Sequence, residues 1–119
     1  MKRNHHNLQT WQKTLELVTE IYKVTDTFPK NELFAITAQM RRAAVSVPSN
    51  IAEGAARTSK RDFLRFLSIA RGSLSELETQ VIISKRLKYL EDETRLIEQI
   101  DNIFGMLNGL IISIKRNNR

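Results

Sequence analysis

Apolar side chains in the first part of the chain follow a helical spacing. They recur at alternating intervals of four and three residues, at Trp11, Leu15, Val18, Tyr22 and Thr25. This spacing is typical of a helix seam that packs against other helices. Leu17, Ile21 and Val24 form a second stripe beside it, so the helix has one wide buried face or two faces for two partners. The pattern predicts a helix over residues 8–26, which Phe28-Pro29 stops because a residue before proline disfavours helical geometry.

A second amphipathic helix is predicted over residues 32–57. Its apolar side holds Leu33, Ile36, Met40, Ala44, Val47 and Ile51. Pro48 lies inside this pattern, but the same phase continues after it, so we expect one proline-kinked helix and not two helices. A further stripe carries small side chains that let another backbone approach closely, at Ala38, Val45, Ala52 and Ala56.

Two more helices complete the pattern, over residues 60–87 and 92–116. Ser59 with Asp62 resembles a capping box at the start of the third helix, and Asp92 is expected to cap the fourth. The third helix carries a heptad seam of Phe63, Leu67, Ala70, Leu74, Leu77, Val81 and Ser84. The fourth carries Leu96, Ile100, Ile103, Leu107, Leu110 and Ile114. Gly105 and Gly109 each disfavour a helix by about 1 kcal/mol relative to Ala, which favours close packing against a neighbour there.

Four helices with short connections predict an all-α fold, an antiparallel up-down-up-down four-helix bundle in one domain over residues 1–119. The chain has only four Gly and two Pro, as expected for long helices and few turns. It has no Cys, so disulfides and thiolate metal sites are excluded and a reducing cytoplasm is expected. No apolar run is long enough to cross a membrane, and the N-terminus lacks a hydrophobic signal region.

The charge distribution adds a candidate binding surface. The net charge is +6, and most of the excess lies between residues 41 and 71. The basic side chains there are Arg41, Arg42, Arg57, Lys60, Arg61, Arg65 and Arg71. Such a concentration favours contact with the backbone of RNA or DNA, without the aromatic pattern of a base-stacking surface. The alternative is a solvated basic face without a partner.

Small side chains predict a second surface, an interface between copies of the chain. One stripe lies on the outward side of the third helix, at Ser68, Gly72, Ser75 and Thr79. The other belongs to the second helix, at Ala38, Val45 and Ala52. Together they favour a bundle that assembles, although ordinary surface serines are the alternative for the first stripe.

Candidate catalytic and metal-binding groups are few. The only histidines are His5 and His6, and two adjacent residues in an N-terminal tail are too few ligands for a metal site. Glu53, Glu76 and Glu78 lack the Glu-x-x-His pairs of a di-iron bundle, and no nucleophile or phosphate loop accompanies them. Glu53 has a structural alternative in an ion pair with Arg57. We therefore expect no enzymatic activity, no metal and no cofactor.

Several segments resemble one protein family over nearly the whole chain. They are TWQKTLEL (Thr10–Leu17), IYKVTDTFPKNELF (Ile21–Phe34), QMRRAAVSVPSNIAEGAARTS (Gln39–Ser59) and FLRFLSIARGSLSELETQ (Phe63–Gln80). They are similar to the four-helix-bundle proteins encoded in intervening sequences of bacterial 23S rRNA genes, also labelled a ribosomal protein family. This chain has Lys88 where that family usually has Gly, which makes a left-handed helix cap less favourable.

The resemblance implies a ring-like homo-oligomer, a pentamer, without established enzymatic activity and with RNA or DNA as a partner. The fold also resembles that of the accessory proteins of diversity-generating retroelements, which work with a reverse transcriptase. Our first hypothesis is therefore a cytoplasmic, non-enzymatic homo-oligomer that binds nucleic-acid backbone. The alternative is an assembly adaptor for a nucleic-acid-processing protein, without direct nucleic-acid binding.

Overall fold

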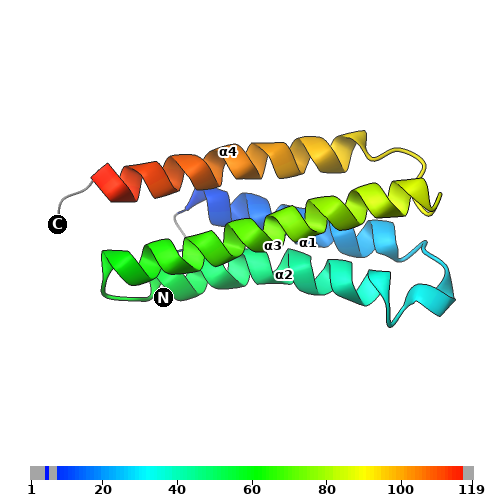
Figure 1. Cartoon of the computed structure of the whole chain (residues 1–119), viewed down its shortest axis with the longest axis horizontal. Coiled ribbons are helices and arrows are strands. Elements are labelled where there is room, and N and C mark those ends of the chain that lie inside the picture. Colours follow the sequence, from blue (N-terminus) through cyan, green and yellow to red (C-terminus); the bar gives the residue numbers. More distant parts are fainter. Residues whose placement is uncertain (1–4, 6–7, 117–119) are drawn as a thin grey trace.

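The structure is a computed structural model that describes residue 5 and residues 8–116. It contains α1 (Gln9–Thr25), the short 3-10 helix η2 (Lys30–Glu32), α2 (Ile36–Ala55), α3 (Lys60–Arg86) and α4 (Thr94–Arg116). Consecutive α-helices run in opposite directions in an elongated bundle of 49 × 25 × 21 Å (Figure 1). The predicted all-α four-helix bundle is confirmed. Within the described residues, no helix is long and apolar enough to span a bilayer.

The core follows the predicted seams of α2, α3 and α4. On α3, every seam position from Leu67 to Ser84 is buried, and α4 buries the first four positions of its seam. Met40, Ala44, Val47 and Ile51 of α2 are also almost fully buried. Pro48 is buried within α2, and the helix continues through it, so the prediction of one helix is confirmed and the kink stays a prediction.

α2 and α3 approach each other closely at Gly54, near the end of α2. A Cβ atom placed on this residue would lie 2.8 Å from the Phe66 Cβ and 3.2 Å from the Phe63 carbonyl oxygen. Neither atom belongs to the flexible end of a side chain, so any larger residue would push α2 and α3 apart. In contrast, Gly105 and Gly109 have open space where a Cβ would lie, so the expected close packing at these two residues is absent among the residues that the structure describes.

The start of α2 differs from the prediction. The chain forms η2 and a turn, and α2 begins only at Ile36, so Leu33 is exposed and Phe34 is 92% exposed. The Tyr89 hydroxyl donates a 2.6 Å hydrogen bond to the Glu32 carboxylate, which holds η2 against the α3–α4 connection. This long-range contact outweighs the local helical pattern, because intrinsic propensity is only a weak preference. α2 also ends at Ala55, two residues before the predicted end.

The predicted seam of α1 faces the core only in part. Its Thr25 is buried, and its Trp11 and Val18 are half-buried and pack against the core. Leu15 and Tyr22 are 40% and 43% exposed. The residues that face the core are the threonines and the second stripe, at Thr10, Thr14, Leu17, Ile21 and Thr25. Thr14 and Thr25 can be buried because their hydroxyls donate to backbone carbonyls of Trp11 and Ile21 in the same helix.

The helix ends are held by local hydrogen bonds. The Ser59 hydroxyl accepts from the Asp62 backbone N–H at 3.1 Å, as predicted. α4 begins at Thr94, two residues later than expected, and the Asp92 carboxylate accepts the Thr94 N–H. Hydrogen bonding from the Thr94 side chain, and to a smaller extent from its backbone N–H, lowers the pKa of Asp92. Lys88 adopts a φ of 65°, and the N–H of Tyr89 donates to the Ser84 carbonyl. α3 therefore ends in a Schellman motif although a lysine occupies its left-handed position.

Candidate nucleic-acid and assembly surfaces

Four of the seven predicted basic residues meet at one end of the bundle. Arg57 lies in the α2–α3 turn, and Lys60, Arg61 and Arg65 lie on the first turns of α3. The guanidinium groups of Arg57 and Arg65 lie 5.0 and 4.6 Å from the centre of the Phe66 ring. Phe66 thus orients two arginines by cation–π contact, and its position depends on the close α2–α3 packing at Gly54.

The last turn of α4 brings two further basic residues to this end. Lys115 and Arg116 are exposed, and in Figure 1 the end of α4 lies at the same end of the bundle as the start of α3. In the sequence, these residues suggested only that basic side chains stabilise the negative C-terminal end of the fourth helix. The antiparallel topology could have located them, because in such a bundle the end of the fourth helix lies at the start of the third. We call these six residues the basic end: Arg57, Lys60, Arg61, Arg65, Lys115 and Arg116.

Arg41 does not belong to the basic end. It lies near the start of α2, where its Nε donates to the Thr25 hydroxyl at 3.0 Å and its guanidinium lies 4.6 Å from the centre of the Tyr22 ring. One of its nitrogens also lies 4.0 Å from the Asp26 carboxylate. Arg41 therefore joins the end of α1 to α2, and its guanidinium is engaged in contacts with α1.

The two remaining arginines lie along the sides of the bundle. Arg42 borders a polar groove between α2 and α3, together with Ser46, Ser73 and Glu76. Arg71 donates a 3.0 Å hydrogen bond to the Asn108 side chain of α4. The seven predicted residues therefore do not form one surface, and the structure groups only four of them.

The small-residue stripe of α2 lines an apolar groove on α1 and α2. The groove has a volume of about 290 Å³ and is lined by Trp11, Leu15, Val18, Val45, Pro48, Ser49 and Ala52. Val45 and Ala52 were predicted interface residues, and Ala38 is half-buried on the same stripe. The α1 residues were missed as interface residues. The feature of the sequence that could have identified them is the presence of two apolar stripes on the first helix. A single bundle cannot fully bury both stripes.

The predicted stripe on α3 lies on the outer surface of the bundle. Ser68, Gly72, Ser75 and Thr79 are all exposed, and they continue the line of Arg61 and Arg65 along the helix. Three large apolar side chains are exposed on the same helix, at Ile69, Ile82 and Ile83. α3 therefore combines a charged beginning with small exposed side chains along its length and exposed isoleucines at Ile69 and near its end.

The candidate carboxylates Glu53 and Glu76 contact side chains one turn away on the same segment. Glu53 forms the predicted ion pair with Arg57, at 3.0 Å. Glu76 accepts a hydrogen bond from Gln80 on the same helix. His5 packs edge-on against Trp11, and His6 lies outside the described residues. Among the residues that the structure describes, no three His, Asp or Glu side chains lie close enough together to hold a metal ion.

Comparison with known proteins identifies a family for the chain. The model of the family described as 23S rRNA-intervening sequence protein matches residues 6–109. A search of curated proteins finds no match. The family match spans all of α1, α2 and α3 and most of α4, which are the elements that form the core and both candidate surfaces. The chain therefore belongs to the 23S rRNA-intervening sequence protein family.

Proposed function

We propose that this protein is a non-enzymatic, self-assembling bundle that binds the backbone of RNA or DNA through the basic end. The observation that supports this most is the convergence of six basic side chains from three segments, accompanied there by the acids Glu53 and Asp62. Close cationic groups repel one another, and a polyanion relieves this repulsion while it releases counterions. A cytoplasmic location, expected from the absence of cysteine, is part of the proposal.

Contacts to phosphate, and not to bases, fit the geometry of this end. Arg57 and Arg65 lie against the half-buried ring of Phe66, so this ring does not offer a free face for a base. Arg61 is exposed one turn away from Arg65, which suits two neighbouring phosphates. The proposed mode is therefore independent of sequence.

The test is the salt dependence of binding to a labelled RNA hairpin and a labelled DNA duplex. The double variant Arg61→Glu/Arg65→Glu removes two phosphate contacts, so the slope of log K against log salt falls by about 2 per protomer. The control is Lys23→Glu/Arg86→Glu, which changes the net charge equally at the other end of the bundle. Equal loss of affinity in both variants, or no binding by the unchanged protein at low salt, contradicts the proposal.

Self-assembly is the second part of the proposal, and the apolar groove on α1 and α2 supports it. Leu15 and Val45 are each 40% exposed on this groove, and their stripes have the heptad spacing that packs helices together. We propose a second copy of the chain as its occupant, with the pentamer that the family resemblance implies. A ring would also multiply the phosphate contacts of each basic end.

Light scattering coupled to gel filtration tests the assembly. The unchanged protein is expected as an oligomer, and Leu15→Glu/Val45→Glu as a smaller species. Thr19→Glu is the control, because Thr19 is exposed on α1 but does not line the groove. A monomer at micromolar concentration of the unchanged protein contradicts self-assembly, whatever the result for nucleic acid.

An adaptor for a nucleic-acid-processing protein is the alternative function. The observation that favours it is the outer face of α3, where Ile69, Ile82 and Ile83 are exposed. A partner captured through this face would remain bound after nuclease treatment and would be lost in Ile69→Asp/Ile83→Asp. Loss of the partner on nuclease treatment would favour direct binding of nucleic acid.

A further inference from the structure

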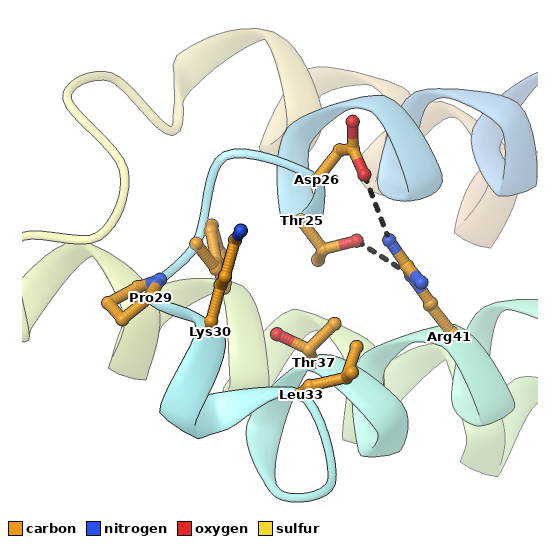
Figure 2. A pocket seen from close by; sticks show the side chains of 8 residues that line it. Thr25, Asp26, Pro29, Lys30, Leu33, Thr37 and Arg41 are labelled. Carbon is orange, nitrogen blue, oxygen red and sulfur yellow. Dashed lines mark hydrogen bonds and ion pairs between the residues drawn. The ribbon is translucent and has the colours of Figure 1, made fainter.

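A hollow of about 240 Å³ lies where α1 passes into α2, at the opposite end of the bundle from the basic end. Figure 2 shows its side chains. Phe28, Pro29 and Leu33 supply apolar surface, and the polar lining consists of Thr25, Asp26, Lys30, Thr37 and Arg41. Neither the basic end nor the apolar groove shares any of these residues, so the hollow is a separate feature.

Thr37 marks the hollow as a binding site. This residue is 98% buried, and its hydroxyl oxygen has no hydrogen-bond partner among the described residues. In Figure 2 the hydroxyl lies on the side of Thr37 that faces Lys30. A buried hydroxyl without a hydrogen-bond partner is unfavourable. A threonine in a helix can adopt two χ1 rotamers, so its hydroxyl can turn toward an acceptor. A ligand with an acceptor atom in the hollow would provide the missing partner.

The charges around the hollow favour an anion. Arg41 and Lys30 stand on opposite sides of it, and Thr25 and Tyr22 hold the Arg41 guanidinium in place. Asp26 is the one acid in the lining, but its side chain is 87% exposed and lies 4.0 Å from Arg41. Because the acid of this pair is exposed to solvent and the two groups are 4.0 Å apart, the pair contributes little, so a ligand anion can replace Asp26 beside the less exposed Arg41. The hollow also lies beside the first turn of α2, where the helix dipole favours negative charge.

The size and lining of the hollow define the class of ligand. An apolar cavity of about 150 Å³ is enough for benzene, so this hollow has room for one ring or branched chain and a small anionic group. A carboxylate matches the fork of one arginine and needs fewer donors than a phosphate dianion. We infer that the hollow binds a small carboxylate with an apolar body. This inference does not depend on the proposed function.

The experiment is an NMR titration of the ¹⁵N-labelled full chain with phenylacetate. We expect the amide signals of Leu33, Thr37 and Arg41 to shift, with a Kd on the order of 1 mM for so small a ligand. Phenylacetamide, which has the same shape without the charge, should bind about tenfold more weakly, because an arginine–carboxylate hydrogen bond is lost.

Thr37→Val separates a binding role from a structural one. The variant should bind phenylacetate about tenfold more weakly, yet its urea midpoint should not fall, because an unpaired hydroxyl is replaced by a methyl group of similar size. Thr19→Val is the matched control: this exposed threonine on α1 bonds to its own helix, and its variant should bind normally. A peptide-like probe, N-acetylphenylalanine, identifies the source: tighter binding than phenylacetate indicates a peptide terminus, and weaker binding indicates a free carboxylate.

Three results would overturn the inference. The first is the absence of shifts at Leu33, Thr37 and Arg41 at about 20 mM phenylacetate, well above the expected Kd. The second is equal affinity for phenylacetamide. The third is unchanged affinity in Thr37→Val, which would leave the hydroxyl without a role in binding.

Discussion

The two ends of the bundle carry similar residue types but use them differently. At the end formed by the α1–α2 and α3–α4 connections, which we call the connection end, cationic and aromatic side chains bind partners on other elements. Arg41 joins α1 to α2, and Tyr89 joins the α3–α4 connection to η2 through Glu32 and packs 5.5 Å from the Phe28 ring. At the basic end, Arg57 and Arg65 lie against Glu53 and the half-buried Phe66 ring at the surface, and Arg61, Lys115 and Arg116 are exposed.

This difference shows how an arginine's role depends on what faces it. Arg41 and Arg61 are both part of basic pairs in the sequence, and each follows the helical pattern of its own segment. Arg41 meets a buried hydroxyl and a tyrosine ring from α1, so it stabilises the fold. Arg61 lies on the outer face of α3, where it is available to a phosphate. Four predictions test this contrast.

The largest effect is expected at Gly54, on which the basic end depends. Gly54→Val should lower the free energy of unfolding by about 3 kcal/mol, because the new side chain meets Phe66 and the Phe63 backbone. Urea unfolding at one fixed protein concentration measures this, since assembly shifts the midpoint. Gly72→Ala is the control: its Cβ meets open space, so the variant should gain up to about 1 kcal/mol from helix propensity. Similar behaviour of the two variants would contradict the packing argument.

The second prediction compares one arginine from each end. Arg41→Met should lower the free energy of unfolding by about 1–2 kcal/mol, because it loses the hydrogen bond to Thr25 and the contact with Tyr22. Arg61→Met should change it by no more than about 0.5 kcal/mol. Affinity for nucleic acid should respond in the opposite way, falling only for Arg61→Met. If Arg41→Met weakened nucleic-acid binding without loss of stability, the two ends would not differ in role.

The third prediction concerns Lys88 at the connection end. Its φ of 65° is unfavourable for a residue with a Cβ, so Lys88→Gly should raise the free energy of unfolding by about 1 kcal/mol. Lys88→Ala removes the same charge but keeps the strained backbone, and it should give little or no gain. Thermal unfolding of both variants measures the difference. Equal gains would attribute the effect to charge and not to backbone geometry.

The smallest effect is a pH dependence at the connection end. The hydrogen bond to Glu32 raises the pKa of Tyr89, with smaller contributions from burial and from the Glu32 charge. The folded state therefore binds this proton more tightly than the unfolded state. The stabilisation is complete below the ordinary tyrosine pKa of about 10 and is lost as the pH rises through the raised value. Tyr89→Phe should abolish this alkaline loss in unfolding curves measured between about pH 8 and 11, and a loss that persists in the variant would assign it to another group.

Local patterns predicted the helices well where packing and pattern agree. The α3 seam from Leu67 to Ser84 was correct because this helix packs against both α2 and α4. The pattern failed at Leu33, where the Tyr89–Glu32 hydrogen bond holds a 3-10 turn in place of the first turn of α2. It held only in part on α1, where Leu15 and Tyr22 of the predicted seam are exposed while Thr10 and Thr14, which lie outside that seam, are buried. Periodicity shows that a face is apolar, but it does not show which neighbour covers that face.

The candidate sites were less predictable than the fold. Arg57, Lys60, Arg61 and Arg65 of the basic run lie together in the structure, because residues close together around one turn stay close in space. It could not separate Arg41 or Arg71 from them, since their partners Thr25 and Asn108 lie on other helices. The hollow at Thr37 had no sequence signal, because its lining comes from α1, the connection after it, η2, the turn after η2, and α2.

The sequence by itself determined the number of helices, most of their boundaries, the capping of α3 by Ser59 and the family of the protein. These depend on spacing, on local hydrogen bonds and on short motifs, all of which act within a few turns of the chain. Only the tertiary structure decided which stripe of α1 faces the core, why Gly54 must be a glycine, and which basic residues remain exposed. Each of these depends on a contact between distant segments, and such a contact has no local pattern in the chain.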